Sequence, residues 1–212
     1  MRQTDSKKLK PDFSFETTHF KAGHLLVAGV DEAGRGPWAG PVVAAAVILD
    51  PTNIPDGLND SKKLNEARRE ELFDKIQATS ETAIGIIEAD EIDRINILQA
   101  TMKAMSTAIA DLPRSPTIAL IDGNRAPVLD CLSETIKKGD ALSLSIAAAS
   151  IIAKVTRDRL MKYLDNQFPG YEFSRHKGYG TAIHAKALAN LGPCPQHRKS
   201  FAPIKALLAD SK

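Results

Sequence analysis

The chain has 212 residues and a formal net charge of +2, with 43% hydrophobic and 25% charged residues. This length suits one domain with a sizeable core, and the composition is that of a soluble globular protein. It excludes a membrane protein, because no apolar run approaches the roughly 20 residues that span a bilayer. The first residues lack the apolar segment of a secretory signal, and Cys131 and Cys194 lie far apart. We therefore expect a reduced, cytoplasmic protein.

Strand-like and helix-like patterns alternate along most of the chain. Residues 1–22 are polar and lack periodicity, which predicts a flexible N-terminal arm before a catalytic domain at residues 23–212. Alternation of this kind indicates an α/β fold with a mixed central sheet flanked by helices. The predicted strands are 24–31, 41–49, 82–89 and 117–123, and the predicted helices are 66–80, 89–112, 143–168, Ala182–Leu191 and Ala202–Ala209. The residues from about 170 to 212 would form a helical C-terminal extension.

The first two predicted strands flank a polar turn with unusual chemistry. Asp31 and Glu32 end the first strand, and Gly34, Arg35 and Gly36 follow them. Such residues also occur in ordinary turns, but an acidic pair beside a buried strand is costly without a partner. Carboxylates beside exposed backbone amides and an arginine can hold a divalent metal against a phosphate. The spacing of the glycines does not match a dinucleotide-binding fingerprint.

Further carboxylates are predicted to join this pair. Asp122 ends another apolar strand, so it would emerge beside Asp31 if the two strands are neighbours. Asp158 lies on the long helix, whose apolar face would pack on the sheet. Four acids at one point, Asp31, Glu32, Asp122 and Asp158, would repel unless cations were bound, and hard oxygen ligands favour two Mg²⁺ or Mn²⁺ ions. Asp140 is the alternative fourth acid, although it could also cap the helix that follows it.

The turn belongs to a longer stretch, residues 27–49, that resembles the signature of ribonuclease HII, the type 2 ribonuclease H family. Six further blocks follow in the same order as in that family, and the resemblance covers roughly residues 24 to 205. The blocks are LNDSKKL at 58–64, IDGN at 121–124, KKGD at 137–140, SIAAASIIAKVTRD at 145–158, HKGYGT at 176–181 and GPCPQHRKSF at 192–201.

The resemblance implies a ribonuclease H-like fold and a metal-dependent endonuclease that hydrolyses phosphodiester bonds. Its expected substrates are the RNA strand of RNA–DNA hybrids and the 5′ side of ribonucleotides embedded in duplex DNA, as in ribonucleotide excision during DNA replication and repair. The resemblance matches Asp31, Glu32, Asp122 and Asp158 to the catalytic carboxylates. It implies nucleic acid as the partner, with no membrane, and we expect a monomer.

A ribonuclease must also detect the 2′-hydroxyl, which donates and accepts hydrogen bonds. The backbone of Gly34, Arg35 and Gly36 could do so, because glycine permits close approach. Tyr179 offers a hydroxyl and a ring face, although it could instead be a half-buried core residue. The resemblance implies that these four residues read the ribonucleotide together. Further basic residues are candidate phosphate contacts: Lys62, Lys63, Lys177, Arg198 and Lys199.

Charge is distributed unevenly, in a way that suits a nuclease. Residues 151–212 hold 11 Lys and Arg against 4 Asp and Glu, a net charge of +7, whereas the remainder carries −5. A basic surface favours phosphates, and an acidic one favours metals. Residues His176, His184, Cys194 and His197 lack the paired spacing of a zinc site.

Two other functions remain open at the level of sequence. A DNA-directed nuclease or integrase-like phosphotransferase would use the same carboxylates but would not need a reader of the 2′-hydroxyl. A nucleic-acid-binding module with structural carboxylates would cleave nothing in magnesium.

Overall fold

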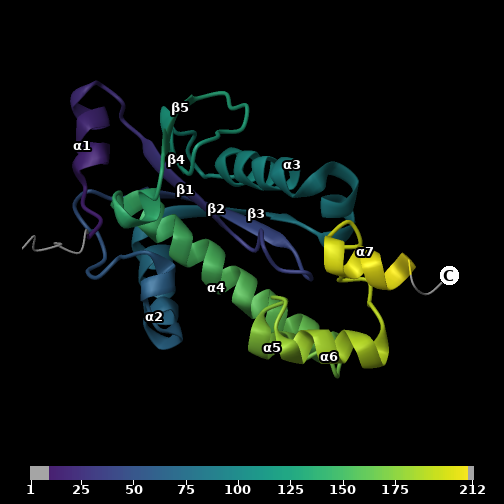
Figure 1. The fold of residues 1–212 in the computed structure, drawn as a ribbon. Helices are drawn as coiled ribbons and strands as arrows, with labels where there is room; N and C mark the ends of the chain where they lie inside the picture. The colour runs from purple at the N-terminus through teal and green to yellow at the C-terminus, as the bar shows by residue number, and fades with distance from the viewer. Residues whose placement is uncertain (1–9, 210–212) are drawn as a thin grey trace, which may run out of the picture.

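The computed structural model describes residues 10–209 and is built around a five-stranded sheet of order β3-β2-β1-β4-β5 (Figure 1). β1 pairs antiparallel with β2, which pairs antiparallel with β3, whereas β1-β4 and β4-β5 are parallel. The predicted mixed sheet is confirmed, and β1, β2 and β3 form its antiparallel part. The strands are β1 (Val27–Ala33), β2 (Val42–Leu49), β3 (Ser80–Ile87), β4 (Ile118–Asp122) and β5 (Leu132–Ile136).

Helices cover both faces of the sheet. α3 (Ala89–Ala110) packs on one face, and α2 (Glu66–Thr79) and α4 (Leu144–Gln167) pack on the other (Figure 1). Both faces of β2 are therefore buried, which explains its continuous apolar sequence. At Gly29 a Cβ atom would lie 2.1 Å from the carbonyl carbon of Ser145, so α4 crosses β1 closely because this position is glycine.

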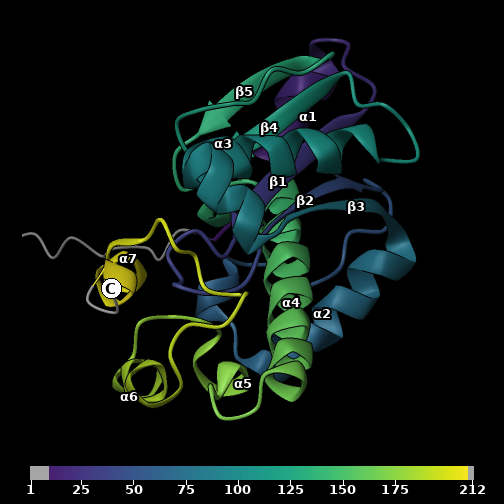
Figure 2. The same ribbon diagram turned by 90° about the vertical axis from the view of Figure 1, so that its right-hand side faces the viewer.

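The C-terminal helices form a separate small cluster beside the end of α4, below the sheet in Figure 2. They are α5 (Phe173–His176), α6 (Ala182–Leu191) and α7 (Ala202–Ala209). This cluster contacts the segment that follows the glycine-rich turn. Trp38 N donates to Gly178 O at 2.8 Å, and Arg198 N donates to Trp38 O at 2.8 Å. The extension is thus attached to the turn that the sequence identified.

The N-terminal region differs from the prediction. Where a flexible arm was expected, Ser14–Lys21 form α1, while residues 1–9 lie outside the described residues. Phe15 and Phe20 pack against the start of β1, at Val27, and against β4. The buried carboxylate of Glu16 accepts from Ser143 Oγ at 2.5 Å and from Ser145 N at 2.9 Å, beside the start of α4. The arm prediction is wrong for this segment, because the tertiary contacts of Phe15, Phe20 and Glu16 hold it against the rest of the domain.

Three other features lack a clear sequence signal. β5 was not predicted because only its last residue, Ile136, is buried. α3 is broken at Asn96, whose φ is 68°. Two short 3-10 turns, η1 (Ser61–Lys63) and η2 (Gly139–Ala141), carry residues that matter for the site. Among the described residues, no helix is long and apolar enough to cross a membrane.

Candidate active site

The ends of β1 and β4 bring the first three predicted carboxylates together. The two strands are parallel neighbours, with Val30 opposite Ile121, so Asp31 and Asp122 follow at the same edge of the sheet. Glu32 is the next residue of β1, and its backbone N–H donates to Asp31 Oδ1 at 2.7 Å. The predicted neighbourhood of the two strand ends is confirmed.

These acids lie in an environment that opposes their ionisation. Asp31 is only 4% exposed, and burial, reinforced by the charges of Glu32 and Asp122, raises its pKa well above the usual value. Burial also raises the pKa of Glu32, even though Arg35 Nη1, 3.4 Å from Glu32 Oε1, opposes that shift. Burial and the neighbouring acids therefore outweigh the positive charge of Arg35 at Asp31 and Glu32.

Asp140 is the fourth acid at this corner. It lies on η2, where the preceding Gly139 N donates to Asp122 Oδ1 at 2.7 Å. Burial raises the pKa of Asp140, and the charges of Asp60 and Asp122 raise it further. Lys62 Nζ, 3.6 Å from Asp140 Oδ2, is the cation beside it. We call Asp31, Glu32, Asp122 and Asp140 the carboxylate cluster.

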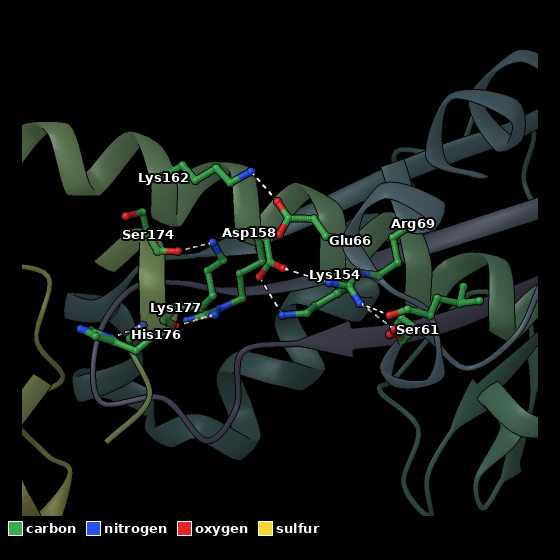
Figure 3. A network of polar contacts seen from close by, with 12 residues as sticks. Ser61, Glu66, Arg69, Lys154, Asp158, Lys162, Ser174, His176 and Lys177 are labelled. Carbon is green, nitrogen blue, oxygen red and sulfur yellow. Dashed lines mark hydrogen bonds and ion pairs between the residues drawn. The ribbon is translucent and has the colours of Figure 1, made fainter. Parts of the chain in front are cut away.

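Asp158 has a different environment. Its Oδ1 accepts from Lys154 Nζ at 2.7 Å, and Arg69 Nη2 lies 3.9 Å from Oδ2 (Figure 3). It also lies 14 residues after the start of α4, which corresponds to about 21 Å of helical rise. The position of Asp158 therefore does not support the prediction that Asp158, and not Asp140, is the fourth carboxylate of the site. Lys154 and Asp158 lie four residues apart on one face of α4 and form an ion pair within the protein.

The structure brings the glycine turn (Gly34, Arg35 and Gly36) to Tyr179. Gly34 is buried with φ +98°, a conformation that favours glycine, whereas Arg35 and Gly36 are exposed. A Cβ atom on Gly36 would lie 3.7 Å from Cε1 of Tyr179. Tyr179 is 47% exposed, so its ring is available at the surface and is not a core residue.

The predicted phosphate contacts fall into two groups. Lys62, Lys63 and Lys199 are exposed, and Lys177 is half-buried with Nζ donating to Ser174 O at 2.5 Å. Arg198 is fully buried, and its guanidinium bonds backbone carbonyls. The prediction that Arg198 contacts phosphate directly is therefore wrong.

Two charged residues near the cluster were not singled out from the sequence. Asp60, within the LNDSKKL block, is one of the acids that raise the pKa of Asp140. Arg125 lines a hollow of about 290 Å³ together with Glu32, Arg35 and Asp122. The position of Arg125 two residues after the IDG segment was the only available signal, and it is too weak to use alone.

The histidines of the C-terminal cluster are buried and contact one another. His184 Nε2 lies 3.0 Å from His197 Nε2, and Cys194 N donates to His197 Nδ1 at 2.9 Å. Burial lowers the pKa of both His184 and His197 to about 4. His184 Nδ1 also lies 3.0 Å from Tyr179 O, so the histidine cluster supports the segment that carries this tyrosine.

Comparison with known proteins assigns the chain to a protein family. The profile of the ribonuclease HII family matches residues 28–204. The chain belongs to the ribonuclease HII family. Ribonuclease HII of Parvibaculum lavamentivorans is 58% identical over 202 residues, which is 95% of this chain and 75% of that protein. Ribonuclease HII 1 of Methylibium petroleiphilum is 60% identical over 188 residues, 88% of this chain and 95% of that protein.

A solved structure agrees with this assignment to the ribonuclease HII family. The ribonuclease H2 of Pyrococcus horikoshii superposes with a TM-score of 0.72 at 27% identity, covering 88% of this chain and 98% of that one. The ribonuclease H-like fold predicted from the sequence is confirmed. The protein is an endonuclease of the ribonuclease H type, a phosphodiester hydrolase that acts on RNA.

Proposed function

We propose that this enzyme is a divalent-metal-dependent endonuclease that cleaves the RNA strand of RNA–DNA hybrids and the 5′ side of ribonucleotides embedded in duplex DNA. One observation carries the proposal. The carboxylate cluster lies beside the glycine turn, through the contact of Arg35 with Glu32, and the same turn meets Tyr179 at Gly36. Hydrolytic groups and a candidate reader of the ribose are thus adjacent.

The donor chemistry of the carboxylate cluster fits Mg²⁺ or Mn²⁺. Asp31, Glu32, Asp122 and Asp140 supply hard oxygen ligands. Burial, together with the charges of neighbouring acids, raises the pKa values of Asp31, Glu32 and Asp140, so a bound cation would favour their ionised forms. Within residues 10–209, no three His, Cys, Asp or Glu side chains are arranged to hold an ion by themselves. In this proposal substrate phosphates and water complete the coordination, as they commonly do for magnesium.

In this proposal Asp31, Glu32, Asp122 and Asp140 would hold two metal ions. Asp140 replaces Asp158 in the set because Asp158 is neutralised by Lys154 and Arg69. When bound, such ions supply an activated water and stabilise the leaving oxygen of an in-line displacement.

The surrounding residues would bind and orient the substrate. The exposed backbone of Arg35 and Gly36 can approach a ribose closely, and the Arg35 side chain can contact the adjacent phosphate. The ring of Tyr179 can stack on the sugar, and its hydroxyl can bond to a ribose. Lys62 and Lys63 would contact backbone phosphates, which fixes the register of the duplex without reading its sequence.

The decisive experiment compares three substrates with one protein preparation. A DNA duplex with a single ribonucleotide, the same duplex without it, and an RNA–DNA hybrid are incubated in Mg²⁺, in Mn²⁺ and in EDTA, and the products are mapped. We expect cleavage of the first and third substrates only, 5′ of the lone ribonucleotide, and none in EDTA. Cleavage of the all-DNA duplex would favour a DNA-directed nuclease instead.

Substitutions in the turn test how the ribose is read. Arg35→Ala and Tyr179→Ala should each lower kcat on the single-ribonucleotide duplex by about 10-fold or more, because orientation acts on the transition state. Lys63→Ala is the matched control and should mainly weaken binding. If both turn variants lose only affinity, measured with an uncleavable duplex in Ca²⁺, ribose sensing must lie elsewhere.

A further inference from the structure

Two arginines are completely enclosed in this enzyme. Arg157 on α4 is 1% exposed, and Arg198, just before α7, is 0% exposed. A buried guanidinium is costly unless its N–H groups are all used, so its partners are held in place. Among the described residues, the hydrogen bonds of both guanidinium groups end on backbone carbonyls.

Arg198 bonds two carbonyls of the glycine turn and one carbonyl beyond it. Its Nη2 donates to Gly34 O at 2.6 Å, and its Nη1 donates to Arg35 O at 3.0 Å. Its Nε and Nη2 donate to Gly40 O at 3.0 and 2.8 Å. In a planar trans peptide the C=O and N–H groups point in opposite directions. The N–H groups of Arg35 and Gly36 therefore point away from the buried guanidinium.

Arg157 joins the other side of the turn to the segment of Tyr179. It donates to Pro41 O at 2.9 Å, to Ala39 O at 3.1 Å and to Lys177 O at 2.9 Å. Its side chain also fills the space beside Gly34, where a Cβ atom would lie 2.1 Å from Arg157 Nε. One guanidinium thus spans two segments that lie far apart in the sequence.

We propose that Arg157 and Arg198 are positioning residues that hold the glycine turn and the Lys177–Tyr179 segment in one rigid arrangement, and thereby set the selectivity for ribose. The proposal rests on the proposed function, in which these segments read the ribonucleotide. Arg198 aims the backbone amides of the turn outward, and Arg157 fixes the distance from the turn to Tyr179. Lysine cannot replace either residue, because one ammonium group lacks the planar fork that reaches two or three carbonyls.

The first test uses Arg198→Lys and Arg157→Lys with the single-ribonucleotide duplex. We expect kcat to fall by about 30-fold or more, since a misplacement of 1 Å can cost about 100-fold. KM and the affinity for an uncleavable duplex in Ca²⁺ should stay within about threefold of the wild type. Leu72→Ala, in the core between α2 and α4, is the control that lowers stability without touching the turn. It should keep its kcat at temperatures where it is folded.

A second test distinguishes positioning from general structural support. If Arg157 acts through Tyr179, the loss from Arg157→Lys should shrink markedly in a Tyr179→Ala background, since coupled residues are not additive. Should an arginine variant fail to fold, Arg157→Gln and Arg198→Gln provide the same test. The planar amide of glutamine keeps two N–H donors but lacks the fork that reaches two or three carbonyls.

Two outcomes would overturn the proposal: full kcat in both lysine variants, or strictly additive losses with Tyr179→Ala. Neither outcome changes the proposed function, which is tested separately by the cleavage of the three substrates with the wild-type enzyme.

Discussion

Asp31 and Asp158 are buried to almost the same extent, at 4% and 5% exposure, yet their surroundings are opposite. Asp158 has Lys154 at 2.7 Å and Arg69 at 3.9 Å, so its charge is balanced within the protein. Asp31 has the acids Glu32, Asp122 and Asp140 as neighbours, and all three of their charges raise its pKa. Burial alone therefore does not identify a functional carboxylate; the sign of the neighbouring charges does.

The charges around Asp31 and Asp158 also indicate different roles for the two acids, one in metal binding and one in stability. An acid that is paired internally contributes to stability, and removing it leaves a buried cation without a partner. Acids that crowd together without enough cations oppose folding until a cation arrives. The carboxylate cluster has the second character, which supports the metal site that we propose there.

The largest expected effect comes from the centre of the carboxylate cluster. Asp122→Asn should reduce cleavage about 1000-fold or more, because losing a metal ligand removes several kcal/mol of transition-state stabilisation. Circular dichroism should show an intact fold. Turnover near the wild-type rate in Mg²⁺ would remove Asp122 from the mechanism.

The substitutions Asp140→Asn and Asp158→Asn test which of the two acids is the fourth carboxylate of the site. The first should lower kcat by about 100-fold or more, for the same reason as Asp122→Asn. The second should keep kcat within about 10-fold of the wild type. Its free energy of unfolding should fall by about 2 kcal/mol, since the substitution leaves Lys154 without its partner.

Single-turnover rates and urea unfolding measure both effects on the same preparations. A larger catalytic loss at Asp158 than at Asp140 would reverse our assignment of the fourth carboxylate.

Divalent cations should stabilise the protein through the carboxylate cluster alone. We expect a rise in Tm of several degrees when 10 mM Mg²⁺, Mn²⁺ or Ca²⁺ replaces EDTA, because a ligand that binds only the folded state stabilises it, and about 1 kcal/mol shifts Tm by about 2–4 °C at this size. Asp158→Asn should keep this rise, and Asp31→Asn should lose most of it. An equal rise in both variants would place the metal elsewhere.

The smallest expected effect is on the pH dependence of the stability of the metal-free protein. Because the folded-state pKa of Asp31 lies above its unfolded value, the native state binds more protons between the two values, and the free energy of unfolding falls as pH rises from about 4. Asp31→Asn removes this penalty. In EDTA, its stability relative to the wild type should therefore increase between pH 4 and pH 8.

Urea unfolding at several pH values measures this difference. Asp158→Asn should be less stable than the wild type at pH 7, so the two substitutions should have opposite signs there. A destabilised Asp31→Asn in EDTA at pH 8 would show that Asp31 is not under electrostatic strain.

Much of the fold was predictable because its signals are local. Continuous apolar runs marked β1, β2 and β4, and their ends located Asp31 and Asp122. The N-cap of α2 is local as well, because Asn65 is a residue type that favours this position and its side chain accepts from Arg68 N. The glycine turn was recognisable because its residue types are unusual beside a buried strand.

The sequence by itself determined the α/β class, the two strand ends with their carboxylates, and the turn that lies next to them. These depend on periodicity and residue type over short segments. The proposal of Asp140 in place of Asp158 rests on the tertiary structure alone, because it depends on how α4 crosses β1 at Gly29. The tertiary structure also decided the role of Arg198, whose residue type suggests a surface but whose partner Gly40 lies 158 residues earlier. Contacts over such separations are set by the packing of whole elements, and no local pattern records them.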